Sequence, residues 1–354
     1  MKIRAVVSSV GARTPVGLSA TPTAYLHRAA HVVMQSSPIL DADEQPATIA
    51  VLPTLDPRMT GSERAAELGV AALKEAIAPL QGIAKNERIK LLCCLDEHLE
   101  RPEAFDLTSK LSREVEKLGA ELDVATSTRG PAALGHALDK ILDELEKGTF
   151  TLAVVGGVHT DYDPARIHAL STAGRLFTPD ALDALIPGEA AAFVVLARGT
   201  NARRLGLPAL LEVHDVATGM ARAKPDNDES AFEASALTAL VRKVSEPLTD
   251  AGLRCGWMLT DLSFETMRLY EFQAMTTRTQ SIWCEPQYCD APAQRLGYLG
   301  AAAMPLHLVL AAESWRGGFA PHDVAMSIAG SDDGDRAAIL ITAPGPEALP
   351  PPEA

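Results

Sequence analysis

A serine lies where a predicted strand meets a predicted helix. Ser127 follows the β-rich residues 122–125, and Pro131 comes four residues later, where the first turn of a helix tolerates proline. Free backbone amides at such a turn can form an oxyanion hole, so Ser127 is a candidate nucleophile of an acyltransferase or hydrolase. In the alternative interpretation, Ser127 is a small residue that hydrogen-bonds the turn.

Arg129, two residues further on, is the second unusual residue of this turn. Its guanidinium could bind a carboxylate or phosphate of a ligand. It could equally pair with Asp261 or Glu189 and close the cavity. The turn therefore predicts either an anion-binding pocket or a plugged one.

The remaining residues with reactive side chains predict no metal or cofactor site. Cys284 and Cys289 form a C-x4-C pair, but a zinc site needs two more ligands, and no second Cys pair or His lies near them in the sequence. The odd number of cysteines, five, argues against a disulfide framework, so reduced and mostly buried thiols are expected. Structural roles are expected for the scattered histidines His136, His159, His168, His214 and His307.

Composition and charge exclude several classes of protein. The 354 residues contain 32 Lys and Arg against 46 Asp and Glu, a formal net charge of −14, which disfavours nucleic acid and anionic lipid as partners. No apolar run is long enough to span a membrane, and the N-terminus does not resemble a signal peptide, so a cytoplasmic location is expected. Hydrophobic residues make up 47% of the chain and aromatic residues only 5%, which predicts a large core of small aliphatic side chains.

Strand and helix patterns alternate along the first half of the chain. Helical spacing of apolar residues is found in residues 62–80, 107–118 and 132–145, and strand-like runs occupy residues 3–10, 89–95, 122–125 and 151–157. This order predicts an α/β fold.

The second half repeats the same order after an apparent linker at residues 199–207. A capping box of Ser230 and Glu233 is expected to start a helix, and Asp333 and Gly334 are expected to close a terminal β-hairpin. We therefore predict two pseudo-duplicated halves, residues 1–200 and 201–345, whose sheets share a central helical layer. Residues 346–354 are expected to be a disordered, Pro-rich tail, and the acidic residues 226–229 a solvated loop.

Four segments, in this order and spacing, resemble the β-ketoacyl synthase branch of the thiolase superfamily. AVVSSVGARTPVG is similar to the opening strand and loop, ATSTRGPAALGHAL to the nucleophile turn and its helix, and LAVVGGVHTDYDP to the next strand. GRLFTPDALDALIPGEAAAFVVL is similar to the segment that ends in a G-E-G-A strand, while MLTDLSFET, LGYLGAAA and the final hairpin give a weaker match in the second half. The resemblance implies a five-layer αβαβα fold and makes Glu189 the buried structural glutamate of that strand.

The chain departs from this family wherever the resemblance implies catalytic residues. The family uses a cysteine nucleophile at a helix N-terminus and two histidines that assist decarboxylation and hold the forming enolate oxygen. Aligned on residues 135–137, Ser127 takes the place of the cysteine and Asp261 that of the first histidine; the second falls at Gly297, or at Tyr298 in the alternative register. The lysine expected shortly before the second histidine is also missing. We therefore expect no condensation chemistry, because an anionic Asp261 would oppose a developing enolate.

The resemblance implies three alternative functions. The favoured one is a catalytically inactive scaffold. The segments TDLSFETMRLYEF and SDDGDRAAIL together resemble thiolase-like proteins encoded beside type VI secretion effectors. This resemblance makes an effector or secretion-system protein the expected partner. The others are a Ser127-dependent acyltransferase or hydrolase, and a non-catalytic partner subunit of an active ketosynthase. The family dimerises through the strand before the nucleophile, here residues 122–125, so a homodimer is expected. The charge of −14 disfavours an acidic acyl carrier protein.

Overall fold

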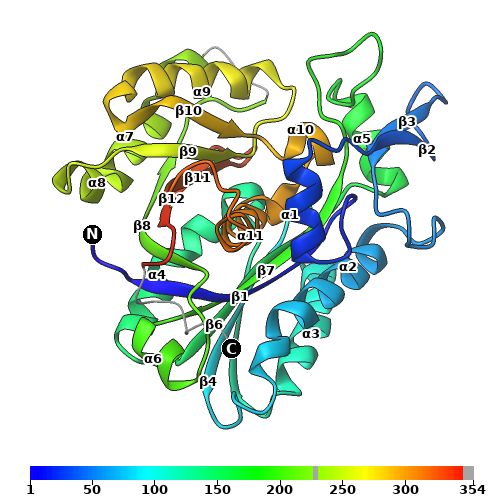
Figure 1. Cartoon of the computed structure of the whole chain (residues 1–354). Coiled ribbons are helices and arrows are strands. Elements are labelled where there is room, and N and C mark those ends of the chain that lie inside the picture. Colours follow the sequence, from blue (N-terminus) through cyan, green and yellow to red (C-terminus); the bar gives the residue numbers. More distant parts are fainter. Residues whose placement is uncertain (226–229, 346–354) are drawn as a thin grey trace.

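The computed structural model describes residues 1–225 and 230–345 (Figure 1). Its strands are β1 (Ala5–Arg13), β2 (Met34–Leu40), β3 (Pro46–Ala50), β4 (Arg88–Cys94), β5 (Glu121–Ser127), β6 (Leu152–Thr160), β7 (Glu189–Ala197), β8 (Leu211–Met220), β9 (Cys255–Thr260), β10 (Trp283–Asp290), β11 (Val324–Gly330) and β12 (Asp335–Thr342). Its α-helices are α1 (Ala20–Arg28), α2 (Gly61–Ile77), α3 (Arg101–Glu116), α4 (Ala133–Glu146), α5 (Pro164–Thr172), α6 (Gly199–Arg204), α7 (Ser235–Val244), α8 (Glu246–Asp250), α9 (Thr266–Arg278), α10 (Ala293–Leu296) and α11 (Ala303–Arg316).

Ten strands form one sheet in the order β10-β9-β11-β12-β8-β1-β7-β6-β4-β5. From β1 outward, β7 and β6 follow in antiparallel pairing and β4 and β5 continue in parallel. The strands β8, β12, β11, β9 and β10 repeat this pattern on the other side. The predicted duplication is thus confirmed at the level of topology. The two expected sheets are, however, joined where β1 pairs with β8.

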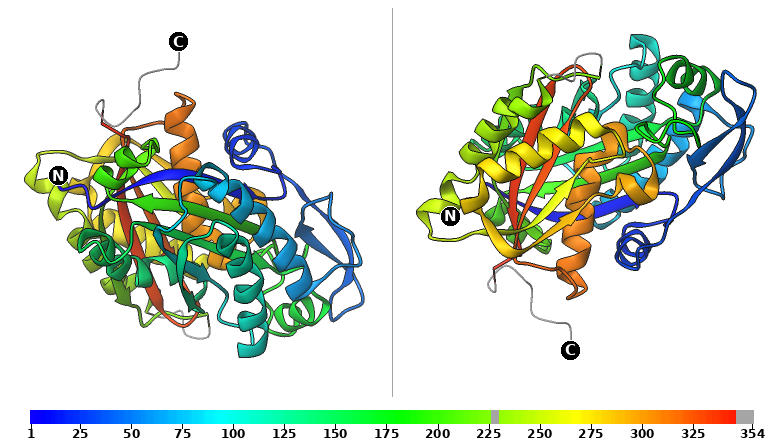
Figure 2. Two further views of the ribbon diagram at one scale, coloured as in Figure 1. Left: turned by 90° about the horizontal axis from the view of Figure 1, so that it is seen from below. Right: turned by 90° about the horizontal axis from the view of Figure 1, so that it is seen from above.

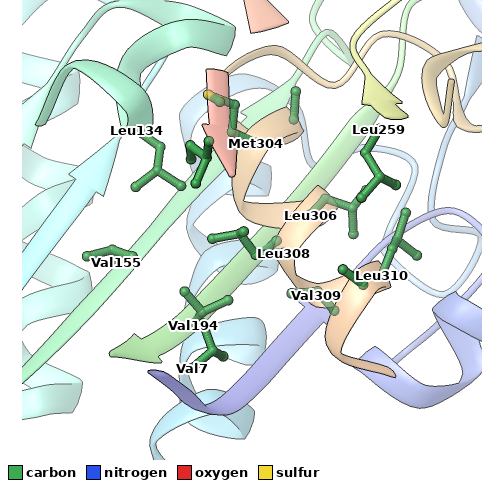
Figure 3. Close-up of a cluster of buried hydrophobic side chains, with 14 of the residues drawn as sticks. Val7, Leu134, Val155, Val194, Leu259, Met304, Leu306, Leu308, Val309 and Leu310 are labelled. Carbon is green, nitrogen blue, oxygen red and sulfur yellow. The ribbon is translucent and has the colours of Figure 1, made fainter. Parts of the chain in front are cut away.

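Helices lie between the two halves of the sheet and on both outer faces. The central helix α11 is buried on every side from Ala303 to Ser314, which its apolar, alanine-rich sequence allows. Figure 3 shows its side chains between Leu134 of α4, Val194 of β7 and Leu259 of β9. The helices α2 and α3 cover the first half and α7 and α9 the second (Figure 2). This is the predicted five-layer αβαβα arrangement.

The terminal hairpin forms as its turn residues predict. β11 and β12 pair in antiparallel register, and Gly334 between them has φ of +103°, a conformation that side-chain-bearing residues rarely adopt. The predicted capping box is wrong, because the side chain of Ser230 makes no capping hydrogen bond and only the short 3-10 turn Ala231–Glu233 follows. The expected linker contains the helix α6.

Several elements were not predicted from the sequence, among them α1, the β2–β3 hairpin, α5 and β10. The helix α1 packs against α11, and the β2–β3 hairpin projects at one end of the molecule (Figure 2). The expected acidic loop at 226–229 and the expected disordered tail at 346–354 lie outside the described residues. Within the described ranges, no helix is both long and apolar enough to cross a membrane.

Candidate functional site

The strand β5 carries Ser127 to the edge of the sheet, where it pairs in register with Cys94 of β4. The carbonyl oxygen of Ser127 accepts a hydrogen bond from the amide of Leu95 at 2.8 Å. In the described part of the chain, its half-buried hydroxyl makes no hydrogen bond. A serine hydroxyl needs an adjacent base to become a nucleophile, and no histidine or carboxylate bonds to this one.

Arg129 pairs with neither of the two carboxylates that the sequence offered. Its Nη1 donates to Asp335 Oδ2 at 2.5 Å, so the prediction of Asp261 or Glu189 as its partner is wrong. Asp335 is fully buried and also lies 3.2 Å from His136 Nε2. The side chain of Arg129 is half exposed. The arginine therefore ties the turn after β5 to the terminal hairpin, a partner far along the chain that local sequence could not identify.

The carboxylate of Asp261 is fully engaged at the end of β9. Both of its oxygens accept from Arg268 Nη2, at 2.9 and 3.0 Å, and Oδ2 also accepts from the amide of Gly330 at 2.7 Å. Arg268 also forms an ion pair with Glu271, and Glu271 in turn pairs with the buried Arg336. Burial lowers the pKa of Arg268, but the neighbouring carboxylates outweigh it and raise that pKa above its usual value. Asp261 thus belongs to an ion-pair network between α9 and the hairpin.

Position 297 has no room for a catalytic side chain. Gly297 has φ of +74°, and a Cβ there would lie 2.6 Å from the carbonyl oxygen of Pro187 and 2.8 Å from Gly188 Cα. The next residue, Tyr298, turns its ring edge-on to that of His159, with 5.2 Å between the ring centres. Burial raises the pKa of the Tyr298 hydroxyl well above its ordinary value. A neutral phenol therefore lies beside the second histidine position.

Glu189 forms a fully buried ion pair at the start of β7. Its carboxylate accepts from Arg64 Nε at 2.5 Å and Nη2 at 2.8 Å, and from the Leu52 amide at 2.6 Å. Thr160 adds a fourth hydrogen bond at 3.1 Å. Glu189 is fully buried and Arg64 is 1% exposed. These contacts agree with a structural role and leave no free oxygen for a ligand.

A second buried ion cluster escaped the sequence reasoning. His159 at the end of β6 has Nδ1 2.6 Å from Asp96 Oδ2 and Nε2 3.1 Å from Asp161 Oδ2, and Arg166 pairs with Asp161 at 2.9 Å. Burial lowers the pKa of His159, but the two carboxylates outweigh it and raise that pKa to about 10. The signal in the sequence was the spacing of His159 in β6 and Asp161 just after it, two residues apart as side chains on one face of an extended chain are. The distant Asp96 gave no signal.

The candidate residues line none of five cavities found among the described residues. Five cavities in the described part of the chain are lined by residues other than Ser127, Arg129, Glu189, Asp261, Gly297 and Tyr298. One of about 550 Å³ lies beside the His159 cluster, between the starts of α2, α3 and α5. Within the described ranges, no group of three His, Cys, Asp or Glu side chains is arranged to hold a metal ion.

Comparisons with known proteins identify the fold. A family model for the N-terminal domain of β-ketoacyl synthases matches residues 124–202, which contain the Ser127 turn and Glu189. The ketosynthase from module 6 of the bacillaene synthase of Bacillus subtilis 168 aligns with a TM-score of 0.74 at 14% identity, covering 96% of this chain and 72% of that one. The chain has a thiolase-like ketosynthase fold.

Two further structures with this ketosynthase fold align over their whole length. The ishigamide ketosynthase/chain length factor gives a TM-score of 0.77 at 17% identity, covering 98% of this chain and 100% of that one. A complex of a type II PKS acyl-carrier protein with its ketosynthase contains a chain that gives 0.79 at 13% identity, with 97% and 100% covered. No curated protein matches the sequence. At such low sequence identities, only the fold is known to be shared with these structures. The chemistry must be argued from the site residues.

Proposed function

We propose that this ketosynthase-fold protein binds partner molecules and does not catalyse condensation. The engagement of Asp261 carries the proposal, because its carboxylate is bonded to Arg268 and to the Gly330 amide where an enolate would need a donor. The unactivated Ser127 and the lack of room at Gly297 add support. The purified protein should neither condense malonyl and acyl thioesters nor cleave acetoacetyl-CoA. Either activity, if lost in Ser127→Ala, would overturn the proposal.

One observation favours the enzymatic alternative, a Ser127-dependent acyltransferase or hydrolase. Glu97 lies against the same turn, where a Cβ on Gly130 would collide with its carboxylate. Desolvation and the nearby Asp96 raise the pKa of Glu97 to about 7, a value suited to a general base. A fluorophosphonate probe separates the two proposals. Labelling that is lost in Ser127→Ala and reduced in Glu97→Gln would favour the enzyme, whereas an unlabelled protein favours the scaffold.

The open edge of the sheet supports a partner-binding role. β5 is the last strand of its half, and Val124 in its middle is 39% exposed. An unpaired edge of this kind can add a strand from a second chain. We propose a homodimer through β5, or a heterodimer with an active ketosynthase, as the name of the ishigamide ketosynthase/chain length factor suggests for that protein.

Light scattering of the protein alone and mixed with a ketosynthase tests the dimer. A mass near two protomers for the wild type and near one protomer for Val124→Pro would support pairing through β5. Proline lacks the backbone N–H that residue 124 would donate to a paired strand. Preference for the ketosynthase over self-pairing would favour the partner-subunit role. A mass of one protomer under all conditions would contradict both.

The finer proposal is an accessory role in type VI secretion, with an effector or spike protein as the cytoplasmic partner. It rests on the resemblance of residues 260–272 and 331–340 to such proteins. The net charge of −14 supports a basic partner over an acidic acyl carrier protein. Co-expression with the products of neighbouring genes tests it. Stable co-purification with an effector or spike protein is expected, and failure to bind any of them would contradict this role.

A further inference from the structure

A cavity of about 720 Å³ lies at the seam where β1 and β8 join the two halves of the sheet. We call it the seam cavity. It is lined by residues of the N-terminal segment before and within β1, the end of α4, the helix α6, the chain leading into β8 and the start of β8, and by Gly345. Figure 1 shows β1, α4, α6 and β8 on the same side of the molecule as the N-terminus. Its volume lies within the range of small-molecule sites, about 300–1,000 Å³.

The seam cavity is remote from the candidate residues of the ketosynthase fold. It adjoins the end of β7, where Ala197 pairs with Leu152, whereas Glu189 at the other end of β7 pairs with Thr160 beside the His159 cluster. The two ends of this nine-residue strand are eight residue steps apart, roughly 26 Å. A ligand in the seam cavity would therefore make no contact with Ser127 or Asp261.

The floor of the seam cavity is aliphatic. Val6, Ala202, Leu207 and Ala209 contribute side chains that are 3–7% exposed, and Ile3 forms a wall that is 47% exposed. No aromatic residue lines it. Such a surface suits the saturated hydrocarbon part of a ligand better than a flat aromatic ring.

Basic side chains outnumber acidic ones in the lining of the seam cavity, although the protein as a whole is acidic: Lys2, Arg4, Arg198 and Arg203 stand against Glu146 and Glu212. The carboxylate of Glu212 accepts hydrogen bonds from the Thr342 hydroxyl and the Gly345 amide. The charges of Lys2 and Arg4 are compensated, since Lys2 pairs with Glu146, and Arg4 pairs with Glu146 and two aspartates of α4. Arg198 donates only to the backbone carbonyl of Glu146, at 3.1 Å. Arg203 makes no side-chain hydrogen bond within the described residues. Two exposed guanidiniums, which have no carboxylate partner among residues 1–225 and 230–345, therefore line the cavity.

We propose that the seam cavity binds a small molecule with an aliphatic body and an anionic head, such as an aliphatic carboxylate or an aliphatic phosphate monoester. The body packs on the floor around Val6 and Leu207, and the head accepts hydrogen bonds from Arg198 and Arg203. Both head groups offer the planar or tetrahedral oxygens that guanidinium binds in a bidentate manner.

Isothermal titration of the full chain with decanoate, decyl phosphate, 1-decanol and decyltrimethylammonium tests the proposal. The two anions should bind, with affinity that falls as salt rises, and the uncharged and cationic compounds should bind at least tenfold more weakly. The stronger anion identifies the natural head group. Equal binding of decanol and decanoate, or no binding of either anion up to millimolar concentration, would overturn the proposal.

Variants in the lining of the seam cavity localise the binding. The double variant Arg198→Gln/Arg203→Gln should weaken decanoate binding by about tenfold or more, because two charge-assisted hydrogen bonds are lost. Arg204→Gln is the matched control, since Arg204 pairs with Glu87 instead and its change should leave the affinity within about twofold. Ile3→Glu, at an exposed position, should weaken the anions and spare decanol. Unchanged decanoate binding in the double variant would refute the assigned site.

Discussion

Removal of the Asp261 carboxylate tests whether this position is structural or open for chemistry. Asp261→Ala leaves Arg268, whose side chain is 11% exposed, with Glu271 as its carboxylate partner. Glu271 is already paired with Arg336, which is fully buried. Two guanidiniums would then share one carboxylate, and the Gly330 amide would lose its acceptor. Breaking a buried pair from one side costs about 3–5 kcal/mol, so unfolding free energy should fall by this amount.

A double-mutant cycle isolates the pair. Asp261→Ala/Arg268→Met removes both charges, keeps most of the arginine's aliphatic volume and restores the balance between Glu271 and Arg336. It should therefore be more stable than the sum of the single changes predicts, by about 2 kcal/mol or more. Urea unfolding followed by circular dichroism and tryptophan fluorescence measures the four proteins. Asp56→Ala is the control, because Asp56 pairs with the exposed Arg58 and its loss should leave the midpoint unchanged.

A change of less than about 1 kcal/mol in Asp261→Ala would refute the network. The ion pairs of Asp261 would then contribute as little to stability as those of an exposed carboxylate, and Asp261 could bind a ligand instead. The same result would remove the main support for a non-catalytic role. Additive effects in the cycle would show that Asp261 and Arg268 do not depend on each other.

Three further predictions concern buried groups. Because the pKa of His159 is raised, its bound proton stabilises the fold fully below about pH 6.5, and this stabilisation is lost as pH rises towards 10. The difference in Tm between the wild type and His159→Gln should therefore become smaller between these pH values. A difference that stays constant would contradict the ion cluster. Gly297→Ala should cost about 1–3 kcal/mol in urea unfolding because of its positive φ and the contact with Pro187, and a neutral effect would contradict the lack of room for a side chain at this position. Burial raises the pKa of Cys93 and Cys255 to about 12, so mass spectrometry after iodoacetamide treatment at pH 8 should find these two thiols unmodified until the protein is unfolded; rapid native labelling would contradict their burial.

Local sequence patterns predicted the layered core well because burial repeats with the period of each element. The apolar face of α4 and the continuous apolar runs of β6 and β7 are buried as their spacing predicts. The alanine-rich α11 explains how a chain with 5% aromatic residues fills its centre, since two sheet halves can approach a helix with small side chains. Resemblance supplied the arrangement of the layers, which periodicity alone does not contain.

Partners far apart in the chain could not be predicted in the same way. Arg129 lies 206 residues from Asp335, and Asp96 lies 63 residues from His159. The sequence around a charged side chain does not indicate which opposite charge it will pair with. Several carboxylates were therefore equally plausible partners for Arg129. The short elements α1, β2 and β3 were missed because their apolar residues are too few to establish a period.

The Ser127 turn was placed correctly as a strand end followed by a helix, but its surroundings decide its chemistry. The resemblance predicted that Ser127 takes the place of the nucleophile and that Asp261 and Gly297 take the places of the two histidines. It did not reveal that Asp261 is held by Arg268, that Gly297 packs against Pro187, or that Glu97 lies over Gly130. These contacts join segments from both halves of the fold, so they follow from the tertiary arrangement alone.

The most direct test of the central claim is a condensation assay on the purified full chain. The protein is incubated with acyl and malonyl thioesters, on coenzyme A and on acyl carrier protein, and released carbon dioxide and β-ketoacyl products are measured beside an active ketosynthase. The contacts of Asp261, Gly297 and Ser127 predict product at the level of the protein-free control, identical for wild type and Ser127→Ala. Turnover by the wild type that disappears in Ser127→Ala would contradict the account.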